Sequence, residues 1–595
     1  MHASSQQKPS PASLLRVGAA ARWLAAVLLV ISFAPVALPF IGSDFPQGHD
    51  SSAHLTQLFR FDRALGQGQL PVRWSEGIHD GTGQPLFNFY QVGFYYFVEL
   101  LHHSGLTLSA AYKAAPPLLW WLGALFMLLL LRPLGLFPAV AGAVAFGLSP
   151  YVIVDAMVRA AYPEFGAITW AVGTLWAADA FLRSGREEYL PLASVFAALL
   201  VVSHLPVTLM AAPAIAAHLT VLCAAVPASR RRLPTLALAG AAGVGLAAFY
   251  LVPAIVEMRH VSMSGLTRNG FDFHRNFVSS LQWTGFLWNY DWNGTGTSVT
   301  DPSDLMPVHV NLVQWCAVAA SIVVAGVQLS RRRAGGTTWG LVAWLGVVAL
   351  ALFMMHGASA RVWETIGPLA FIQFPWRFFL LVSIGGGALV ALLVSGVPDR
   401  RMQAVVVLLL VAAHVHLYHR RLRADRHLPI AGYNIDDRAW GLSDDARRVA
   451  HDEASYDPTG VVRDPSTRGR WSVAGGATTI APLGVSETQL ILQTAGRSWS
   501  VVRLHTPWFP GWRVRIDDEE TPFERAPGTG YLDVRVPPGR HVVDARFVNT
   551  PVRAAANVVS TLSGVLIAVL AMQAHRARVI RTKRRVSMDS LPASG

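Results

Sequence analysis

Residues 109–131 read SAAYKAAPPLLWWLGALFMLLLL, a stretch in which Lys113 is the one charged side chain. At about 1.5 Å per residue, a helix of this length crosses the roughly 30 Å of hydrocarbon in a bilayer. The whole chain has the same bias, because 52% of its 595 residues are hydrophobic and only 14% are charged. Soluble domains usually carry about 25% charged residues. The stretch therefore predicts a membrane-spanning helix, and the composition predicts several more.

Apolar blocks of similar length recur along the chain, and each one predicts a span. The first block follows a tail, 1–21, that we expect to be disordered and cytoplasmic. No small-residue cleavage site follows this first block, so we expect the block to be a membrane anchor and not a removable signal peptide. We predict twelve spans, at 22–42, 109–131, 135–152, 163–183, 188–203, 205–226, 232–256, 307–329, 337–357, 374–396, 402–418 and 553–573.

Arginine clusters mark alternate connections between these spans, as cytoplasmic loops do under the positive-inside rule. The net charge of +13 is therefore a signal of orientation, and it gives no support to nucleic acid as a partner. We expect a multi-pass protein of the inner (cytoplasmic) membrane, with both termini and the basic tail 574–595 in the cytoplasm. The basic residues are Arg16 and Arg22, Arg132, Arg183 and Arg186, Arg230–Arg232, Arg331–Arg333, Arg400 and Arg401, and Arg576, Arg578, Arg581, Lys583, Arg584 and Arg585. The expected external loops are 43–108, 151–164, 257–306 and 358–373.

The segment 86–104 is apolar enough to cross the membrane, but a crossing there would place every later basic cluster outside. Its Tyr and Phe content and the paired His102 and His103 suit the membrane interface. We therefore predict an interfacial or re-entrant helix over 86–104.

A second kind of pattern begins after the eleventh predicted span, in the segment 419–552. Strand-like alternation occurs in RSWSVVRL, GWRVRI, YLDVRV and RHVVDARF, and Pro-Gly pairs punctuate the turns between them. The sequence predicts an external all-β domain of the sandwich type, inserted before the final span. The predicted fold class is thus a polytopic α-helical membrane protein with a C-terminal periplasmic β domain.

The first external loop holds titratable residues in GSDFPQGHDSSAHL, namely Asp44, His49, Asp50 and His54. Asp50 precedes a helix-like run, 51–66, so it is a candidate helix cap. The alternative is a general base just outside the membrane. Because Asp50 and His54 are four residues apart, a metal-binding pair on one helix face also stays open.

Three further charged residues border the outer ends of predicted spans. Arg159 is suited to bind phosphate through its two-pronged guanidinium, or else it contacts lipid headgroups or pairs with Glu164. Arg377 in FIQFPWRFF (371–379) follows Pro375 at a membrane border, where a snorkelling arginine at a span end is one interpretation. We expect His204 to be a buried hydrogen-bonding histidine and Glu364 to pair with Arg361.

The first loop resembles a known family through GHD and HL, followed by GQGQLPVRWSEGIHDGTGQPLFNFY. It is similar to the bacterial membrane family labelled as 6-pyruvoyl-tetrahydropterin-synthase-related and, more distantly, to GT-C glycosyltransferases. In GT-C enzymes an aspartate of this loop is catalytic and two helices lie along the membrane. The resemblance implies that Asp50 is the catalytic residue and that 51–66 and 86–104 are the two surface helices.

Three other segments resemble the same superfamily. One is FIQFPWRFF, and its resemblance implies that Arg377 could hold the phosphate or pyrophosphate of a lipid donor. SPYVIVDAMVRAAYPEFGAI is similar to the second external loop of GT-C oligosaccharyltransferases, in which an arginine precedes an acidic pair. Arg159 and Glu164 match in order, which makes Glu164 a second catalytic candidate, but the acidic pair is absent. HTPWFPGWRVRIDDEE resembles the C-terminal β domain of related bacterial enzymes. Its Trp508 and Trp512 are candidates for a sugar platform or for strand packing, and the Trp-rich part of 257–306 suits sugar or bilayer contact equally.

Together these features predict a membrane glycosyltransferase that moves a sugar from a polyprenyl-phosphate donor to an acceptor hydroxyl on the external face. Its expected partners are this lipid-linked sugar, membrane lipid, and a cell-envelope glycan or lipid acceptor. A divalent metal stays open as a cofactor, and no nucleotide cofactor is expected, because the sequence has no P-loop or dinucleotide-binding fingerprint. The alternatives are a transporter or flippase for a lipid-linked glycan and a non-catalytic polysaccharide assembly or binding protein.

Overall fold

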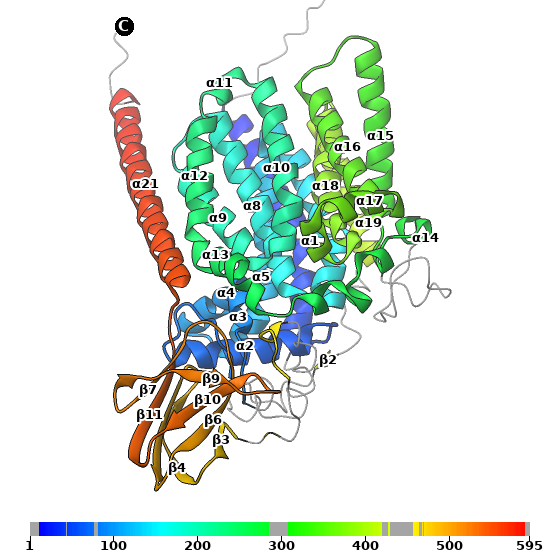
Figure 1. The fold of residues 1–595 in the computed structure, drawn as a ribbon. Coiled ribbons are helices and arrows are strands. Elements are labelled where there is room, and N and C mark those ends of the chain that lie inside the picture. Colours follow the sequence, from blue (N-terminus) through cyan, green and yellow to red (C-terminus); the bar gives the residue numbers. More distant parts are fainter. Residues whose placement is uncertain are drawn as a thin grey trace, which may run out of the picture.

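The computed structural model of the chain describes residues 11–42, 45–76, 81–284, 307–418, 427–428, 456–462, 467 and 469–589. Its helices form an elongated bundle with a β domain at one end (Figure 1). The last helix, α21 (Pro551–Asp589), leaves the β domain and runs back along the bundle. The predicted combination of a helical membrane region with a C-terminal all-β domain is confirmed.

Nine helices in the described ranges are long and apolar enough to cross a membrane, or eleven spans if each of two bent helix pairs counts as one. The remaining predicted span, 188–203, corresponds to α9 (Tyr189–Ser203), which is apolar but shorter than the others. The other eight long helices are α1 (Pro11–Ala37), α5 (Leu108–Leu131), α8 (Tyr162–Ser184), α10 (Leu205–Ala225), α15 (Leu312–Ser330), α16 (Gly336–Met355), α18 (Phe379–Ser395) and α19 (Arg400–Tyr418).

The two bent pairs change the predicted boundaries of their spans. Helix α6 (Leu136–Gly147) is followed at 51° by a helical stretch, 150–159, and α12 (Leu233–Leu246) turns by 66° into α13 (Ala248–Glu257) and the turn after it. The stretch 150–159 consists of α7 (Pro150–Ile153) and a π-helical turn, Val154–Arg159. The segment predicted as the external loop 151–164 is therefore helical as far as Arg159.

The connection between α1 and α5, which the sequence predicts as the first external segment, contributes three helices that lie between the bundle and the β domain (Figure 1). They are α2 (Ser51–Gly66), α3 (Leu86–Phe89) and α4 (Gly93–His103). Within 86–104 the longest helix has 11 residues, which is about 16 Å and too short to cross a bilayer. The segment is thus a pair of short helices, as expected from its charge context, and it does not form a span.

The β domain contains two antiparallel sheets that share one core. One has the order β3-β6-β10-β9 and the other β4-β5-β11-β7-β8. Alternate residues of the strands point into the core, which contains Leu492, Val502, Val534 and Val543. The strands are β3 (Trp471–Gly475), β4 (Thr478–Ser486), β5 (Gln489–Gly496), β6 (Ser500–Pro507), β7 (Trp512–Ile516), β8 (Glu519–Glu520), β9 (Phe523–Arg525), β10 (Tyr531–Val536) and β11 (Gly539–Phe547); β1 (Phe45–Pro46) pairs with β2 (His427–Leu428) beside the bundle.

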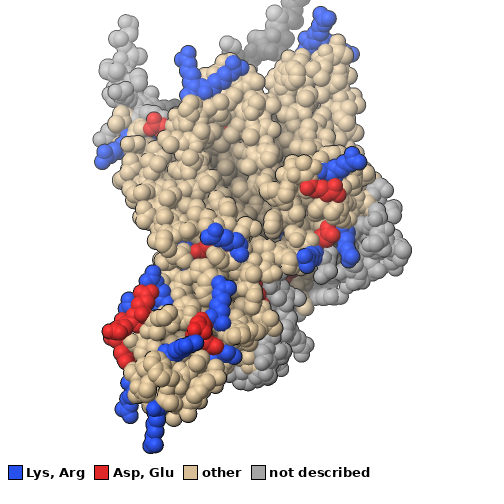
Figure 2. Space-filling model, in the orientation of Figure 1, with Lys and Arg blue, Asp and Glu red and all other residues tan. Residues whose placement is uncertain are grey.

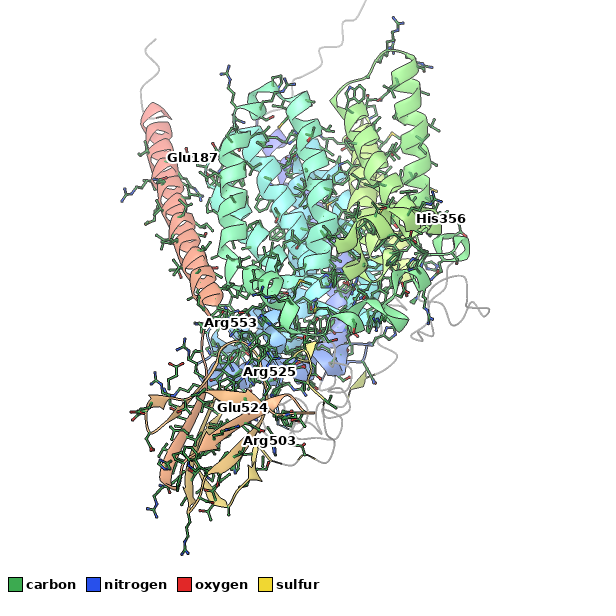
Figure 3. All side chains as sticks on the ribbon, in the orientation of Figure 1. Glu187, His356, Arg503, Glu524, Arg525 and Arg553 are labelled. Carbon is green, nitrogen blue, oxygen red and sulfur yellow. The ribbon has the colours of Figure 1, made fainter. Side chains whose placement is uncertain are left out.

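Charged side chains separate into two zones on the face shown in Figure 2. Mostly Lys and Arg lie at the end of the bundle away from the β domain, and mixed charges lie on the β domain and on the part of the bundle nearest to it, whereas much of the surface between is uncharged. Figure 3 places Glu187 near the far end and Arg553 at the junction with the β domain. Exposed apolar residues such as Leu238, Leu409 and Leu562 suit the intervening surface to lipid.

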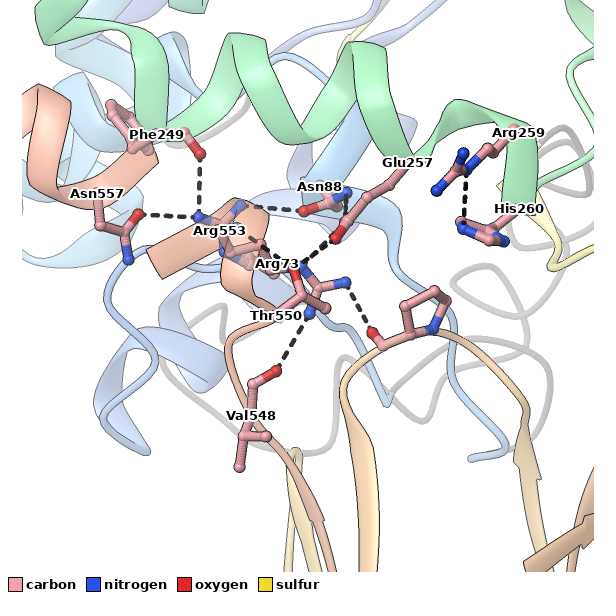
Figure 4. Close-up of polar contacts among 11 residues, drawn as sticks. Arg73, Asn88, Phe249, Glu257, Arg259, His260, Val548, Thr550, Arg553 and Asn557 are labelled. Atoms are coloured by element: carbon pink, nitrogen blue, oxygen red, sulfur yellow. Dashed lines mark hydrogen bonds and ion pairs between the residues drawn. The ribbon is translucent and has the colours of Figure 1, made fainter. Parts of the chain in front are cut away.

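A buried polar network joins the bundle, the first external segment and the β domain (Figure 4). Glu257 at the end of α13 accepts hydrogen bonds from Asn88 and from the fully buried Arg553, each at 2.9 Å. Arg553 also donates to the carbonyl oxygen of Pro510 at 2.9 Å. Arg73 donates to Asn88 at 3.0 Å and to Asn557 of α21 at 3.1 Å. Arg553 thus joins the β domain to the bundle, because it contacts both Glu257 of the bundle and the Pro510 carbonyl of the β domain.

A second junction cluster brings Glu76 and Glu487, two acidic residues of different segments, together. Glu487, in the turn between β4 and β5, accepts a hydrogen bond from the backbone N–H of Glu76. Arg63 of α2 reaches Glu487 at 3.3 Å and Glu76 at 3.4 Å, and Arg470 pairs with Glu76. The Gln67 side chain accepts from the Glu487 N–H at 2.6 Å. Burial and the nearby charge of Glu76 raise the pKa of Glu487 to about 7.

Candidate active site

Two backbone hydrogen bonds join the first external segment to the π-helical turn that ends at Arg159. The N–H of His49 donates to the carbonyl of Val158, and the N–H of Asp50 donates to the carbonyl of Arg159, both at 2.8 Å. Gly48 allows this approach, because a Cβ there would lie 2.7 Å from both Ala160 Cβ and the Val158 oxygen. The contact places Asp50 next to Arg159, two residues that the sequence puts in separate loops.

Asp50 occupies the N-cap position of α2, but its side chain does not cap the helix. Its carbonyl accepts from the His54 N–H at 2.9 Å, so only the backbone of Asp50 starts the helix. Within the described ranges its carboxylate has no hydrogen-bond partner, and the residue is half-buried. Helix capping therefore does not explain the carboxylate, which stays open to a ligand.

Glu164 holds two arginines from different parts of the chain. Its Oε2 lies 2.9 Å from Arg159 Nη1 and 2.9 Å from Arg377 Nε. The hydroxyl of Tyr151 donates to its other oxygen, and Arg159 also pairs with Asp155. Glu164 and Asp155 are at most 1% exposed, so two buried anions balance two nearly buried cations.

Aromatic rings set the planes of both guanidinium groups. Arg159 lies 4.4 Å from the centre of the Trp376 ring, and Arg377 lies 4.8 Å from the centre of Phe374. The two rings are themselves stacked at 4.8 Å. Nη2 of Arg159 and Nη2 of Arg377 have no partner among the described residues, and the two residues are 5% and 7% exposed. Both arginines therefore keep donors that suit a phosphate.

The backbone beside Arg159 is strained. Ala160 has a φ of 54°, in the left-handed region that L-residues other than Asn, Asp and Gly seldom adopt. It directly follows the π-helical turn, a distortion that often occurs at functional sites. Because this turn directs the carbonyl of Arg159 to the N–H of Asp50, the strained residue lies where the two predicted site segments meet.

The histidines of the first loop have different surroundings. His54 is buried among aromatic rings, and its Nδ1 lies 2.9 Å from the Tyr95 hydroxyl. Burial lowers the pKa of His54 to about 4, so the ring is neutral at physiological pH. His49 contacts the π-helical turn through its backbone N–H, which donates to the Val158 carbonyl. No group of three or more His, Cys, Asp or Glu in the described part of the chain is arranged to hold a metal.

The two tryptophans proposed as a sugar platform lie at the junction of the β domain. Trp512 is 5% exposed and packs edge-on against Trp74 of the first external segment, with ring centres 5.2 Å apart. Trp508 is half-buried, with the Arg525 guanidinium 3.4 Å from its ring centre. The contacts of Trp512 match the packing alternative, and one face of Trp508 is covered by Arg525, which Figure 3 labels on the β domain.

The contacts of His204 and Glu364 test two further predictions from the sequence. His204 is buried and its Nδ1 accepts from the Val207 N–H at 3.2 Å, which confirms it as a hydrogen-bonding histidine that caps α10. The expected partner of Glu364 was wrong, because Glu364 contacts His274 at 3.2 Å and not Arg361. His274 comes from a loop 90 residues earlier in the chain, and sequence proximity gives no sign of this contact.

The sequence interpretation missed several residues of the cluster. Asp155 was not among the predicted residues, and it pairs with the same nitrogen of Arg159, Nη1, as Glu164 does. Its spacing of four residues from Arg159 was an available signal. Tyr151, Trp376 and Gln373 gave no comparable signal. Asp44 and the Trp-rich stretch 285–306 lie outside the described residues.

The chain is partly similar in structure to several solved proteins. No protein-family model matches the chain, and no curated protein matches it. It is similar to the arabinofuranosyltransferase AftD from Mycobacteria (18% identity, 69% of this chain and 27% of that one, TM-score 0.42). It is also similar to the apo oligosaccharyltransferase of Archaeoglobus fulgidus (16% identity, 73% of this chain and 56% of that one, TM-score 0.40). A third similar structure is arabinosyltransferase EmbB from Mycobacterium smegmatis (12% identity, 92% of this chain and 65% of that one, TM-score 0.36). The chain spans about a quarter of AftD and about half of the oligosaccharyltransferase. At this similarity no residue role passes from those proteins to this chain.

Proposed function

We propose that this chain is a membrane glycosyltransferase that moves a sugar from a polyprenyl-phosphate donor to an acceptor hydroxyl at the external face. The observation that carries the proposal is the backbone contact between Asp50 and Arg159. It places a carboxylate that has no hydrogen-bond partner among the described residues next to Arg159, and Glu164 joins Arg159 to Arg377, a second arginine that keeps donors for a phosphate. A base and an anion site next to each other are the parts that such a transfer requires.

Asp50 is the proposed general base. The acceptor hydroxyl gives its proton to the Asp50 carboxylate while its oxygen forms a bond to the anomeric carbon. The bond between that carbon and the phosphate oxygen breaks, and its electron pair leaves with the lipid phosphate. A positioned base contributes about 10²–10⁴ in rate. Asp50 suits this role because capping does not occupy its carboxylate.

Arg159 and Arg377 are proposed to bind the lipid phosphate and to stabilise the charge that it gains on leaving. Their positions on either side of one carboxylate oxygen of Glu164 favour convergence on a common anion. Glu164 itself has both oxygens engaged by Tyr151 and the two arginines. We therefore assign Glu164 a positioning role in place of direct catalysis.

The proposed orientation puts the site and the β domain outside and both termini in the cytoplasm. It is supported by the position of the β domain, because the arginine clusters lie at the opposite end of the bundle on the face shown in Figure 2. Polyprenyl-linked donors suit this side, since their phosphate lies at the membrane surface within reach of span ends such as that of Arg377.

Asp50→Asn tests the base. Asn keeps the size of the side chain and ranks beside Asp at a helix N-cap, but it cannot accept a proton as a carboxylate does. We expect normal membrane insertion and an unchanged melting temperature, with sugar transfer reduced about a hundredfold or more. Transfer is followed in membranes as consumption of a lipid-linked sugar. Transfer at the wild-type rate in Asp50→Asn would remove Asp50 as base.

A lipid-linked glycan transporter is a second candidate, favoured by the two bent helix pairs. Interrupted spans with charged residues at the break occur in transporters, and the break after α6 leads to Asp155 and Arg159. The two functions differ in one measurement on purified protein in vesicles. A transporter moves the labelled lipid between leaflets without changing it, whereas the transferase releases lipid phosphate.

A further inference from the structure

Residues Ile372–Phe374 form a tight γ-turn just before Arg377. The Phe374 N–H donates to the Ile372 carbonyl at 2.6 Å, which closes a three-residue turn around Gln373. Gln373 has φ 65° and ψ −47°, close to the rare and strained form of the γ-turn. A glycine would adopt this conformation with less strain, so the presence of a long polar side chain calls for a reason.

The Gln373 side chain connects two segments. Its Oε1 accepts a hydrogen bond from Arg377 Nη1 at 3.2 Å, and its Nε2 donates to the carbonyl of Leu266 at 2.9 Å. The Ile372 carbonyl that closes the γ-turn also accepts from Arg377 Nη1, at 2.6 Å. One turn therefore supplies two acceptors to the same guanidinium nitrogen, and Leu266 fixes the amide that supplies one of them.

The remaining donors of Arg377 are divided by these contacts. Nε is held by Glu164 at 2.9 Å and Nη1 by the γ-turn, while Nη2 has no partner in the part of the chain that the structure describes. With two of its three nitrogens fixed and its plane set by Phe374, the guanidinium has one orientation. The γ-turn thereby determines where Nη2 points.

We propose that Gln373 is a positioning residue that, from a strained γ-turn, orients Arg377 so that Nη2 meets the phosphate of the lipid-linked donor. The inference rests on the proposed function and adds to it the residue that orients the phosphate ligand. Gln373 itself touches no substrate. The strained conformation persists because Arg377 and Leu266 hold the two ends of the amide.

The test measures binding of a short-chain polyprenyl phosphate without sugar to the purified full chain. Gln373→Ala removes the amide and keeps the strain, whereas Gln373→Gly removes both. We expect each to weaken binding about tenfold or more, as loss of a hydrogen bond to a charged group does, and Gln373→Gly to melt higher than Gln373→Ala. Gln403→Ala is the matched control, because it removes an amide that donates to the Val397 carbonyl at 2.8 Å near the other end of α18.

A double-mutant cycle separates positioning from general stability. If Gln373 acts through Arg377, adding Gln373→Ala to Arg377→Ala weakens binding no further than Arg377→Ala alone. Gln373→Gly with wild-type affinity, or effects of Gln373→Ala and Arg377→Ala that add, would overturn the inference and leave the phosphate site in place. Unchanged affinity in Arg377→Ala would instead refute the phosphate site of the proposed function. Melting temperatures of all variants identify any that fail to fold, and Gln373→Gly keeps the test available if Gln373→Ala does so.

Discussion

The backbone N–H of Asp50 donates to the carbonyl oxygen of Arg159 at 2.8 Å, so the two residues belong to one structural unit. Side-chain contacts between surface loops break easily, but paired backbone hydrogen bonds fix the loops without using either side chain. The two backbones are therefore held together while the Asp50 carboxylate and Nη2 of Arg159 have no hydrogen-bond partner among the described residues. Effective catalysis depends on this kind of fixed geometry.

Gly48→Ala tests the contact between the loops. The new Cβ would lie 2.7 Å from Ala160 Cβ and from the Val158 carbonyl, which belongs to backbone and cannot rotate away. We expect the loops to separate and sugar transfer to fall tenfold or more, since displacements of about 1 Å can cost about a hundredfold. Gly66→Ala is the control, because a Cβ there meets nothing within 4 Å. Equal activity in both variants would contradict the proposed link.

Glu164→Gln tests the charge balance of the arginine cluster. The substitution leaves Arg159 and Arg377 close together with Asp155 as the nearest remaining anion. Removing one partner of a buried ion pair costs about 3–5 kcal/mol, so we expect a clear drop in melting temperature. Bound polyprenyl phosphate should restore part of it, because the phosphate replaces the missing negative charge. Glu524→Gln serves for comparison, as its pair with Arg535 is largely exposed and should matter little.

The Glu76 and Glu487 cluster predicts how stability changes with pH. Burial raises the pKa of Glu487 from 4.5 to about 7, so the folded state binds its proton more tightly than the unfolded state. The stabilisation is complete below about pH 4.5 and is lost as the pH rises through about 7, with a magnitude on the order of 3 kcal/mol. Gln67, Arg63 and Arg470 also face this cluster.

Melting curves between pH 5 and pH 8 check this expectation. The wild type should lose melting temperature across that interval, and Glu487→Gln should flatten the loss because it cannot ionise. A wild type that gains stability with rising pH, or a variant with the same slope, would show that Glu487 does not determine the change.

Orientation is checked by thiol labelling of intact cells. Trp499 in the β domain is 65% exposed and Arg333 lies in the exposed connection between α15 and α16. In a chain with Cys223 and Cys316 replaced by Ala, a membrane-impermeant reagent should modify Trp499→Cys and leave Arg333→Cys untouched until the cells are lysed. The reverse labelling would invert the proposed topology.

Much of the fold follows from short-range pattern in the sequence. Apolar runs such as 109–131 predict α5 because a helix in lipid satisfies its own backbone, and alternation predicts β5 and β11 in the same way. The bend after Gly147 coincides with Pro150, a residue type that ends or kinks helices, but the apolar run continues past it and the span was predicted through residue 152. Composition alone cannot show that a helix continues after a change of direction.

The site was predicted as a set of residues and not as an arrangement. Asp50, Arg159 and Arg377 could be selected because charged residues at the outer ends of spans are uncommon. Their convergence depends on Glu164, which joins Arg159 to a residue 213 positions later than itself, and no local pattern encodes such a contact. For Trp512 the sequence left a sugar platform and strand packing open, and its contact with Trp74 matches the packing alternative.

The Arg73 to Asn557 hydrogen bond spans 484 positions, and it bears on how the protein is made. Ribosomes add about 5–20 residues per second, so Arg73 waits roughly half a minute or longer for its partner to be synthesised. Arg553, which anchors the β domain, emerges equally late. During that interval the segment that carries Asp50 lacks its final supports. The segment that carries Asp50 is therefore completed only when the last helix arrives, and premature termination within the β domain would leave an inserted chain without these supports.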